Sequence, residues 1–350
     1  MPNLQADDIV DLVKTTQKDL GELKWTEIAT DLQEHVALPH LLSSEKVGFD
    51  SGYGIQWNLM TEHSGAAHDT GLYAVDNVNV ADVMQQAFIP WRHVTTSYAI
   101  ERRELAMNRE PRRIVDLVKV RRADAMLGLA EHMEARFWQA PTGPNDDRLF
   151  GVGYWAVYNA TTGFNGQNPA GFSDVAGLDS SSNAFSRWRN FTANYAAVSQ
   201  QDLIKKWREA AVKTHFKPLA SMNQPSYAGA DKYGYYTNYN VLGTLEESLR
   251  DQNDNLGNDI APKDGQVVFR RVPVTYVPYL DKAANDPIYG INWSVFQPVF
   301  LSGEYMREMG PNVASNQHTV LNTHIDCTLN VRCTNRRRLF VLAKGAITFS

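Results

Sequence analysis

The sequence predicts a mixed α+β fold in which strand-rich segments flank one long helix. Apolar and polar residues alternate in several short stretches, first over residues 53–59, and a period of two is typical of strands. Between residues 111 and 137 the apolar residues recur instead at helical spacing. After Gly257 the strand pattern returns and continues almost to the end of the chain. Strands and helices are therefore segregated along the chain, as in α+β proteins.

The first 46 residues are predicted to be helical and acidic. Two apolar stripes fit helical spacing, and Pro39 ends the second stripe. The stripes consist of Ile9, Leu12, Val13 and Leu20, followed by Trp25, Ile28, Leu32 and Val36. Acidic residues outnumber lysines throughout this stretch. Two interpretations stay open: a solvated helix face, or an arm that lies on a neighbouring subunit.

Residues 47–82 are predicted to form two long strands joined by a tip of small residues. Alternation is clear over residues 53–59 and weaker over residues 73–80. A long hairpin with little core of its own needs another surface on which to pack. Its aromatic and methionine side chains are of the types that protein interfaces favour. The candidate contact residues are Trp57, Leu59, Met60, His63, His68 and Tyr73. A further strand is predicted over residues 94–100.

The strongest helical pattern runs over residues 111–139. Pro111 suits a first helical position, and Pro141 and Gly143 end the pattern. At 1.5 Å per residue the helix would be roughly 43 Å long. Residues 141–198 are rich in Gly, Asn and Ser and predict short strands and loops. Further helices are predicted after a capping serine, Ser199, and over residues 238–252.

Composition and motifs argue against several functional classes. The net charge of −5 speaks against wrapping nucleic acid by bulk positive charge. We find no apolar run long enough for a membrane span and no secretory leader. The phosphate-loop, HExxH, CxxC and GxSxG patterns are missing. The sequence therefore suggests no catalytic residue, cofactor site or metal site.

Two clusters of polar residues resemble chemical sites but are better explained by other roles. The most metal-like cluster has a spacing that fits no common zinc pattern, and exposed tip residues explain it better; it consists of Glu62, His63, His68 and Asp69. Asp281 and Asp286 lie in turn-forming sequence, where aspartate caps the backbone. The two cysteines, Cys327 and Cys333, are predicted to lie on one strand. Six residues of strand span roughly 20 Å, which is too far for a disulfide.

A run of three arginines, Arg336, Arg337 and Arg338, follows the last cysteine. Three interpretations stay open for it. The run is a charged turn between two strands, a contact with nucleic acid, or a clamp on an acidic segment of a neighbouring subunit. The acidic first 46 residues are the obvious partner for such a clamp. The three arginines are therefore added to the candidate contact residues.

The order of elements, from helical arm to hairpin, long helix, mixed lobe and C-terminal strands, resembles the tailed-bacteriophage major capsid protein of the Hong Kong 97 fold. The most specific resemblance lies in residues 265–345. Its segments are GQVVFRRVPVTYVPYLD, DPIYGINWSVFQPVFLSGEYMRE and LNVRCTNRRRLFVLAKG. They are similar to the strand and turn segments that complete the two domains of many phage capsid proteins.

The resemblance implies a division of the chain into five parts. These are an N-terminal arm (1–46), an extended loop with its base (47–103), a spine helix of the peripheral domain (104–144), most of the axial domain (145–290), and the return strands with the C-terminal strand (291–350). Such proteins are structural and have no cofactor.

The implied partners are many copies of the same chain, in hexamers and pentamers, together with a portal protein and a scaffold or cement protein. Packaged double-stranded DNA would be touched without sequence preference, and no membrane is involved. The protein would be assembled in the host cytoplasm and reside in the virion. Two alternatives are an encapsulin-like compartment shell and a soluble metal-dependent hydrolase that uses His63, His68 and Asp69.

One departure from the family pattern is informative. Some members join a loop lysine covalently to an asparagine of a neighbour. Here no lysine occurs between Lys46 and Lys119, so the loop lacks the nucleophile. The sequence therefore predicts a shell held together without covalent links.

Overall fold

The computed structural model describes residues 32–42, 47–49, 52–63, 68–69, 71–72, 83–107, 111–216, 232–253, 267–314 and 317–349. The chain divides into two compact units. One, here called the long-helix unit, includes His93–Met133 and Gly303–Thr328. The other, here called the sheet unit, includes Glu34–Arg92, Glu134–Ser302 and Leu329–Ser350. Within the described residues, no helix is long and apolar enough to cross a membrane.

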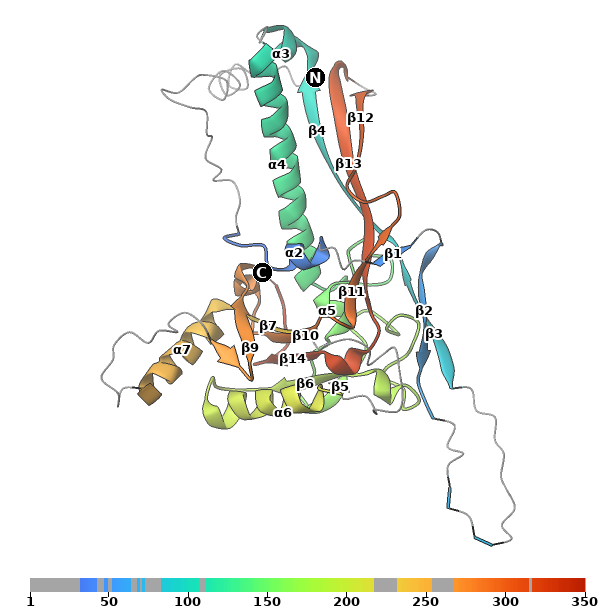
Figure 1. The fold of residues 1–350 in the computed structure, drawn as a ribbon, viewed down its shortest axis with the longest axis vertical. Helices are drawn as coiled ribbons and strands as arrows, with labels where there is room; N and C mark the ends of the chain where they lie inside the picture. Colours follow the sequence, from blue (N-terminus) through green and yellow to red (C-terminus); the bar gives the residue numbers. More distant parts are fainter. Residues whose placement is uncertain are drawn as a thin grey trace. The chain divides into compact units, whose positions relative to one another are not determined.

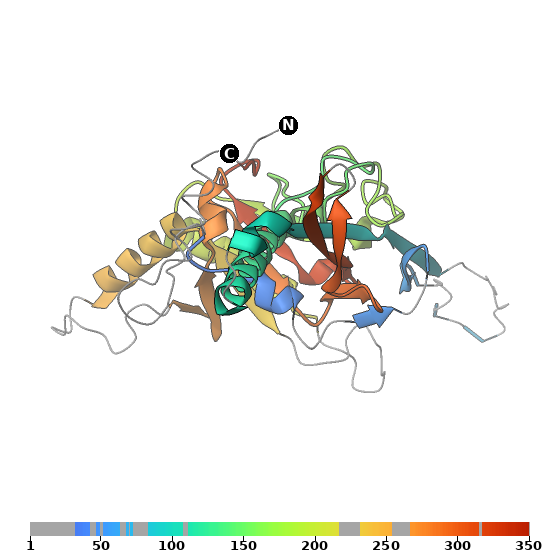
Figure 2. The same cartoon turned by 90° about the horizontal axis from the view of Figure 1, so that it is seen from above.

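The long-helix unit contains most of α4 (Pro111–Trp138) beside a ribbon of strands. β4 (Arg92–Glu101) and β12 (Arg307–Ala314) both pair with β13 (Gln317–Cys333), and both views show α4 alongside them (Figures 1 and 2). α3 (Arg102–Met107) lies between β4 and α4 in the chain. The predicted helix over residues 111–139 is therefore confirmed, with Pro111 at its first position.

Polar contacts fix α4 to the strand beside it. The Thr96 hydroxyl donates to the carbonyl oxygen of Ala125 at 3.3 Å. The Arg121 guanidinium donates to the carbonyl oxygen of Ala99 at 2.8 Å and forms an ion pair with Glu104. Arg121, which interrupts the apolar pattern of the helix, thus serves to join α4 to the end of β4 and the start of α3.

The sheet unit contains a seven-stranded sheet with the order β5–β6–β14–β10–β7–β9–β8. In chain order its strands are β5 (Gly163–Gly166), β6 (Asn190–Asn194), β7 (Tyr233–Thr237), β8 (Val268–Phe269), β9 (Val272–Tyr276), β10 (Ile288–Asn292) and β14 (Phe340–Ala343). β14 pairs in parallel with β6 and antiparallel with β10. The last strand of the chain thus completes the sheet whose other strands come from residues 163–292.

Two helices contribute to the core on one face of this sheet. α6 (Lys205–Lys213) buries Trp207, and α7 (Tyr239–Asn253) buries Val241, in one cluster with Tyr235, Ile288 and Phe340 of the strands. The predicted capping serine before α6 is confirmed, because the Ser199 side chain accepts a hydrogen bond from the Asp202 amide. A single π-helical turn (Gln200–Ile204) precedes α6. The helix predicted over residues 238–252 is confirmed as α7.

Aromatic side chains from the end of α4 fill the other face of the sheet. The ring centroid of Trp138 lies 5.5 Å from that of Tyr236 of β7 and 6.0 Å from that of Tyr289 of β10. Tyr235 and Tyr236 of β7 therefore serve opposite faces, as the alternation of a strand requires. The short helix α5 (Val152–Trp155), which follows α4 in the chain, buries Tyr154 and Trp155. Short 3₁₀ turns cover Ser186–Trp188, Pro278–Lys282 and Arg336–Arg338.

A second group of strands in the sheet unit joins distant parts of the chain. β1 (Val47–Phe49) pairs in parallel with β11 (Phe296–Leu301), and β11 pairs antiparallel with the end of β13. β2 (Gly54–Met60) and β3 (Met84–Pro90) form a two-stranded hairpin. Residues 84–90 are thus the partner of β2, whereas the sequence pattern predicts a partner strand at residues 73–80. Residues 73–80 lie outside the described residues.

Two other predictions can be compared with this fold. Of the acidic stretch over residues 1–46, the described part holds one short helix, α2 (Ala37–Leu41), and residues 1–31 and 43–46 lie outside it. Both cysteines lie on β13, buried and unbridged as predicted. Burial raises the pKa of the Cys333 thiol to about 12, so this thiol stays protonated near neutral pH.

Candidate functional site

The β2–β3 hairpin has a buried side only near its base. Ile55, Ala87 and Ile89 are completely buried, whereas Gln56 and Asn58 on the opposite side are exposed. Trp57 is half-buried, and its ring centroid lies 6.2 Å from that of Trp155. The expectation that the hairpin lacks a local packing partner is therefore wrong for its base. Trp57 already packs on its own chain before any neighbour is present.

Exposure increases toward the tip of the hairpin. Met60 and Met84 face each other in register and are each about half exposed, at 53% and 50%. His63 and His68 are exposed, and Leu72 is 93% exposed. Tyr73 lies outside the described residues. Apolar side chains are therefore offered to another molecule toward the tip, and at the base by Tyr53, which is 92% exposed directly before β2.

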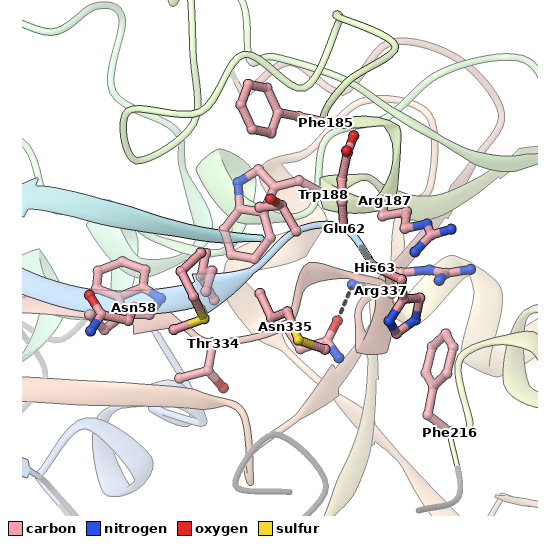
Figure 3. Close-up of a pocket in the computed structure, with 15 residues that line it drawn as sticks. Asn58, Glu62, His63, Phe185, Arg187, Trp188, Phe216, Thr334, Asn335 and Arg337 are labelled. Atoms are coloured by element: carbon pink, nitrogen blue, oxygen red, sulfur yellow. Dashed lines mark hydrogen bonds between the residues drawn. The ribbon is translucent and has the colours of Figure 1, made fainter. Parts of the chain in front are cut away.

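A groove of about 540 Å³ runs along the hairpin and the adjoining loops of the sheet unit. We call it the hairpin groove (Figure 3). It is lined by residues from five separate stretches of chain. These are residues 57–63, Met84, Phe185 with Arg187 and Trp188, Phe216, and Thr334 with Asn335 and Arg337. Five candidate contact residues lie in it together: Trp57, Leu59, Met60, His63 and Arg337. The fold therefore brings together the hairpin and one of the three arginines.

One end of the hairpin groove is basic. Figure 3 shows Arg187, His63 and Arg337 gathered there beside Phe216. The Arg337 guanidinium lies over the rings of Phe164 and Phe216, at 4.6 and 4.8 Å from their centroids. The Asn335 side chain accepts from the Arg337 amide at 3.1 Å and holds the turn. Cation–π contacts of this kind help to fix a guanidinium in place.

Arg336 has a structural role that the sequence did not reveal. It is completely buried, and its guanidinium donates to five neutral oxygens at 2.8–3.3 Å. These acceptors are the carbonyls of Trp155, Trp188, Gly166 and Gln167 and the side chain of Asn190. Burial lowers the pKa of Arg336 to about 10, so the group stays charged near neutral pH. Arg336 therefore connects the backbones of α5, β5 and the Ser186–Trp188 turn with the Asn190 side chain of β6.

The arginine run is therefore neither a solvated turn nor a continuous basic clamp. Arg338 is 1% exposed and donates to the carbonyl oxygen of Phe216 at 2.9 Å. Only Arg337 lies at the hairpin groove. Arg336 and Arg338 are therefore not contact residues, contrary to the prediction, because buried side chains cannot reach another molecule.

Arg187, Phe185, Trp188 and Phe216 were missed by the sequence reasoning. Phe185, Arg187 and Trp188 lie in loop-rich sequence without periodicity, and Phe216 follows the helix α6. Only the fold places the four beside the hairpin. The one available signal for Arg187 in the sequence is its place among aromatic residues in a Gly- and Asn-rich stretch, since arginine and aromatic residues are enriched at interfaces.

The polar clusters set aside earlier remain without a chemical role. Glu62, His63, His68 and Asp69 are all exposed, and in the described part of the chain no group of three or more potential ligands could hold a metal ion. Burial disfavours the charged form of Asp286. Hydrogen bonds from Lys344 and Asn238 outweigh it and hold the pKa of that carboxyl below its usual value. Asp281 accepts from the Tyr239 amide, in the capping role that its turn sequence predicted.

Comparison with known proteins identifies the fold. No family model matches the sequence, and no curated protein is similar to it in sequence. The capsid asymmetric unit of cyanophage A-1(L) matches 93% of this chain and 97% of its own, with a TM-score of 0.63 and 15% identity. The capsid of the native GTA particle (93% and 96%, TM-score 0.54, 12% identity) and the capsid of Myoviridae phage XM1 (94% and 97%, TM-score 0.54, 9% identity) are also similar. The expected Hong Kong 97-type α+β fold is thus confirmed over nearly the whole chain.

Proposed function

We propose that this chain is the major capsid protein of a tailed bacteriophage, and that many copies assemble into the icosahedral shell around the DNA genome. The observation that carries the proposal is the agreement of nearly the whole fold with solved capsid chains. The match covers 93–94% of this chain, so it does not rest on one shared domain. A shell subunit also needs no catalytic centre, and we propose no enzymatic activity.

The hairpin groove supports a role in contacts between copies. Its exposed apolar residues and the 93% exposed Leu72 at the tip need a partner surface, and its basic end offers hydrogen-bond donors. Leu72 does not line the groove, so the end of the tip around Leu72 and the groove are different surfaces of one chain. Contacts between two different surfaces are heterologous, and they build rings or lattices and not simple two-fold dimers. Such contacts suit hexamers and pentamers.

The five-part division of the chain is retained as part of the proposal, with one adjustment. β14 pairs with β6 and β10, so the C-terminal strand belongs to the sheet that we assign to the axial domain. A portal, a scaffold or cement protein, and packaged DNA are proposed partners, and the virion is the proposed location.

Electron microscopy of the purified protein tests the proposal. We expect closed shells of uniform curvature, because heterologous contacts that close produce a finite lattice. Particles isolated from infected cells should contain nuclease-protected DNA, whereas an encapsulin-like compartment would contain protein cargo. A preparation that stays monomeric at 39.3 kDa under all assembly conditions would overturn the proposal.

The lack of a loop lysine gives a second test. Assembled shells boiled in SDS are expected to run as a single band near 39 kDa, because no lysine lies between Lys46 and Lys119 to form an isopeptide link. Covalent ladders or rings on such gels would contradict a non-covalent shell.

A further inference from the structure

Glu134, near the end of α4, is a completely buried carboxylate that fixes a distant part of the chain. The Ala37 amide donates to both of its oxygens, at 3.0 and 2.9 Å, and the Leu38 amide donates at 2.9 Å. The Trp138 indole N–H donates at 2.8 Å from the same helix. One carboxylate therefore joins α4 to the start of α2 across 97 residues of sequence.

These hydrogen bonds replace a cap that α2 lacks. The first amides of a helix have no partner within the helix, and a side chain of the preceding residue usually satisfies them. Here the preceding residue is Val36, whose side chain makes no such bond. A buried carboxylate without donors would be strongly unfavourable, and buried amides without acceptors would also be unfavourable. Each group is stable in this position only because the other is present.

A second contact holds the same segment. The His40 ring is stacked on Trp293, with centroids 3.9 Å apart and planes within 12°. Ala37 and Leu41 are buried, and α2 packs on β11. Segment 34–42 is therefore attached to the sheet unit at both ends of its one helical turn. We call this attachment, made by Glu134 and His40, the arm latch.

The arm latch lies where a highly charged stretch joins the fold. Residues 1–46 contain nine of the 39 acidic residues and four of the 34 lysines and arginines. The remainder of the chain therefore has thirty of each, so the whole net charge of −5 belongs to residues 1–46. Segment 34–42 follows most of this charged stretch in the sequence and belongs to the described fold.

We propose that Glu134 is a positioning residue for assembly, because it fixes segment 34–42, the described part of the fold that follows the acidic residues 1–31 in the sequence. This inference rests on the proposed capsid function and adds a residue to it. Without the carboxylate, the sheet and the long helix keep their own cores, but segment 34–42 is released. Subunits then fold and fail to join correctly.

The test compares the full-length chain with Glu134→Gln, which keeps the side-chain volume but presents an NH₂ group to the amide donors. Asp124→Asn, an exposed carboxylate on the same helix, is the matched control for the change in charge. We expect amide hydrogen exchange in residues 34–42 to become about tenfold faster or more in Glu134→Gln, as in a local opening, while β10 and β14 stay protected. The yield of closed particles should fall by a similar factor, and Asp124→Asn should change neither.

Several outcomes would overturn the inference. Particles from Glu134→Gln at the wild-type yield despite released exchange would show that the latch does not guide assembly. Unchanged exchange in residues 34–42 would show that Glu134 does not hold the segment. If Glu134→Gln does not fold, His40→Ala decides, because it loosens the same segment without disturbing the buried carboxylate. Normal assembly of a His40→Ala chain whose residues 34–42 exchange faster would then contradict the proposed role of the arm latch. Failure of the wild type to assemble would instead count against the proposed function itself.

Discussion

Replacing Arg336 with alanine is expected to lower the free energy of unfolding of the subunit by about 3–5 kcal/mol, among the largest effects of any single substitution. Five oxygens accept hydrogen bonds from this guanidinium, and none of it is exposed. After truncation these acceptors would be left in a cavity without their donor. Chemical denaturation of unassembled subunits measures the effect.

Arg336→Lys should recover only part of the loss. An ammonium has three donors in a compact group, whereas the planar guanidinium spreads five donors over acceptors on different loops. The neighbouring Arg337→Ala is the matched control, because Arg337 is half-buried and stacks on two rings. Its loss should cost about 1 kcal/mol or less in stability. An Arg336→Ala chain as stable as Arg337→Ala would contradict the role assigned to the buried arginine.

Removing the tip of the hairpin is expected to abolish shell formation while leaving the subunit folded. The Thr61 amide donates to the carbonyl oxygen of Val83 at 3.1 Å, so the two residues can be joined by a two-residue Asn-Gly turn in place of residues 62–82. None of the buried core residues of the described structure lies in that stretch. Circular dichroism and thermal unfolding should therefore resemble the wild type, whereas sedimentation should show only small species.

A point substitution separates the contact from the length of the loop. Leu72→Ser removes one exposed apolar side chain from the tip, and Val212→Ser removes an exposed valine (55%) from α6 as the matched control. We expect Leu72→Ser to lower the particle yield and Val212→Ser to leave it unchanged. Each ~1.4 kcal/mol of contact energy lost per subunit changes an association constant about tenfold. Normal shells from the shortened hairpin would disprove the role of the tip.

The sequence predicted well those elements that have clear ends and a strong period. α4 was found with its first residue, because Pro111 and Pro141 bracket a long helical pattern. β3 was missed, because Gln85, Gln86 and Pro90 weaken its alternation, and valines at residues 75–80 imitate a strand better. Period alone cannot choose between two candidate partners for β2. The hydrogen-bond register in the fold makes that choice.

The candidate site was predictable only on the hairpin side. Trp57, Leu59, Met60 and His63 were found because they lie on one patterned strand and its extension. Their neighbours in the groove come from loops more than a hundred residues away, which no local pattern connects. A run of charged residues normally indicates an exposed surface, but Arg336 is buried. The carbonyl oxygens that accept its hydrogen bonds come from residues 155–188, far away in the sequence. No local pattern could therefore predict its burial.

A cryo-electron microscopy reconstruction of the assembled particle would show what each hairpin groove contacts. We expect that in every copy the groove residues Met60, His63 and Arg337 lie against atoms of another copy, and that Leu72 is buried against another copy. A closed particle in which the groove and the tip face solvent in all copies would contradict this expectation.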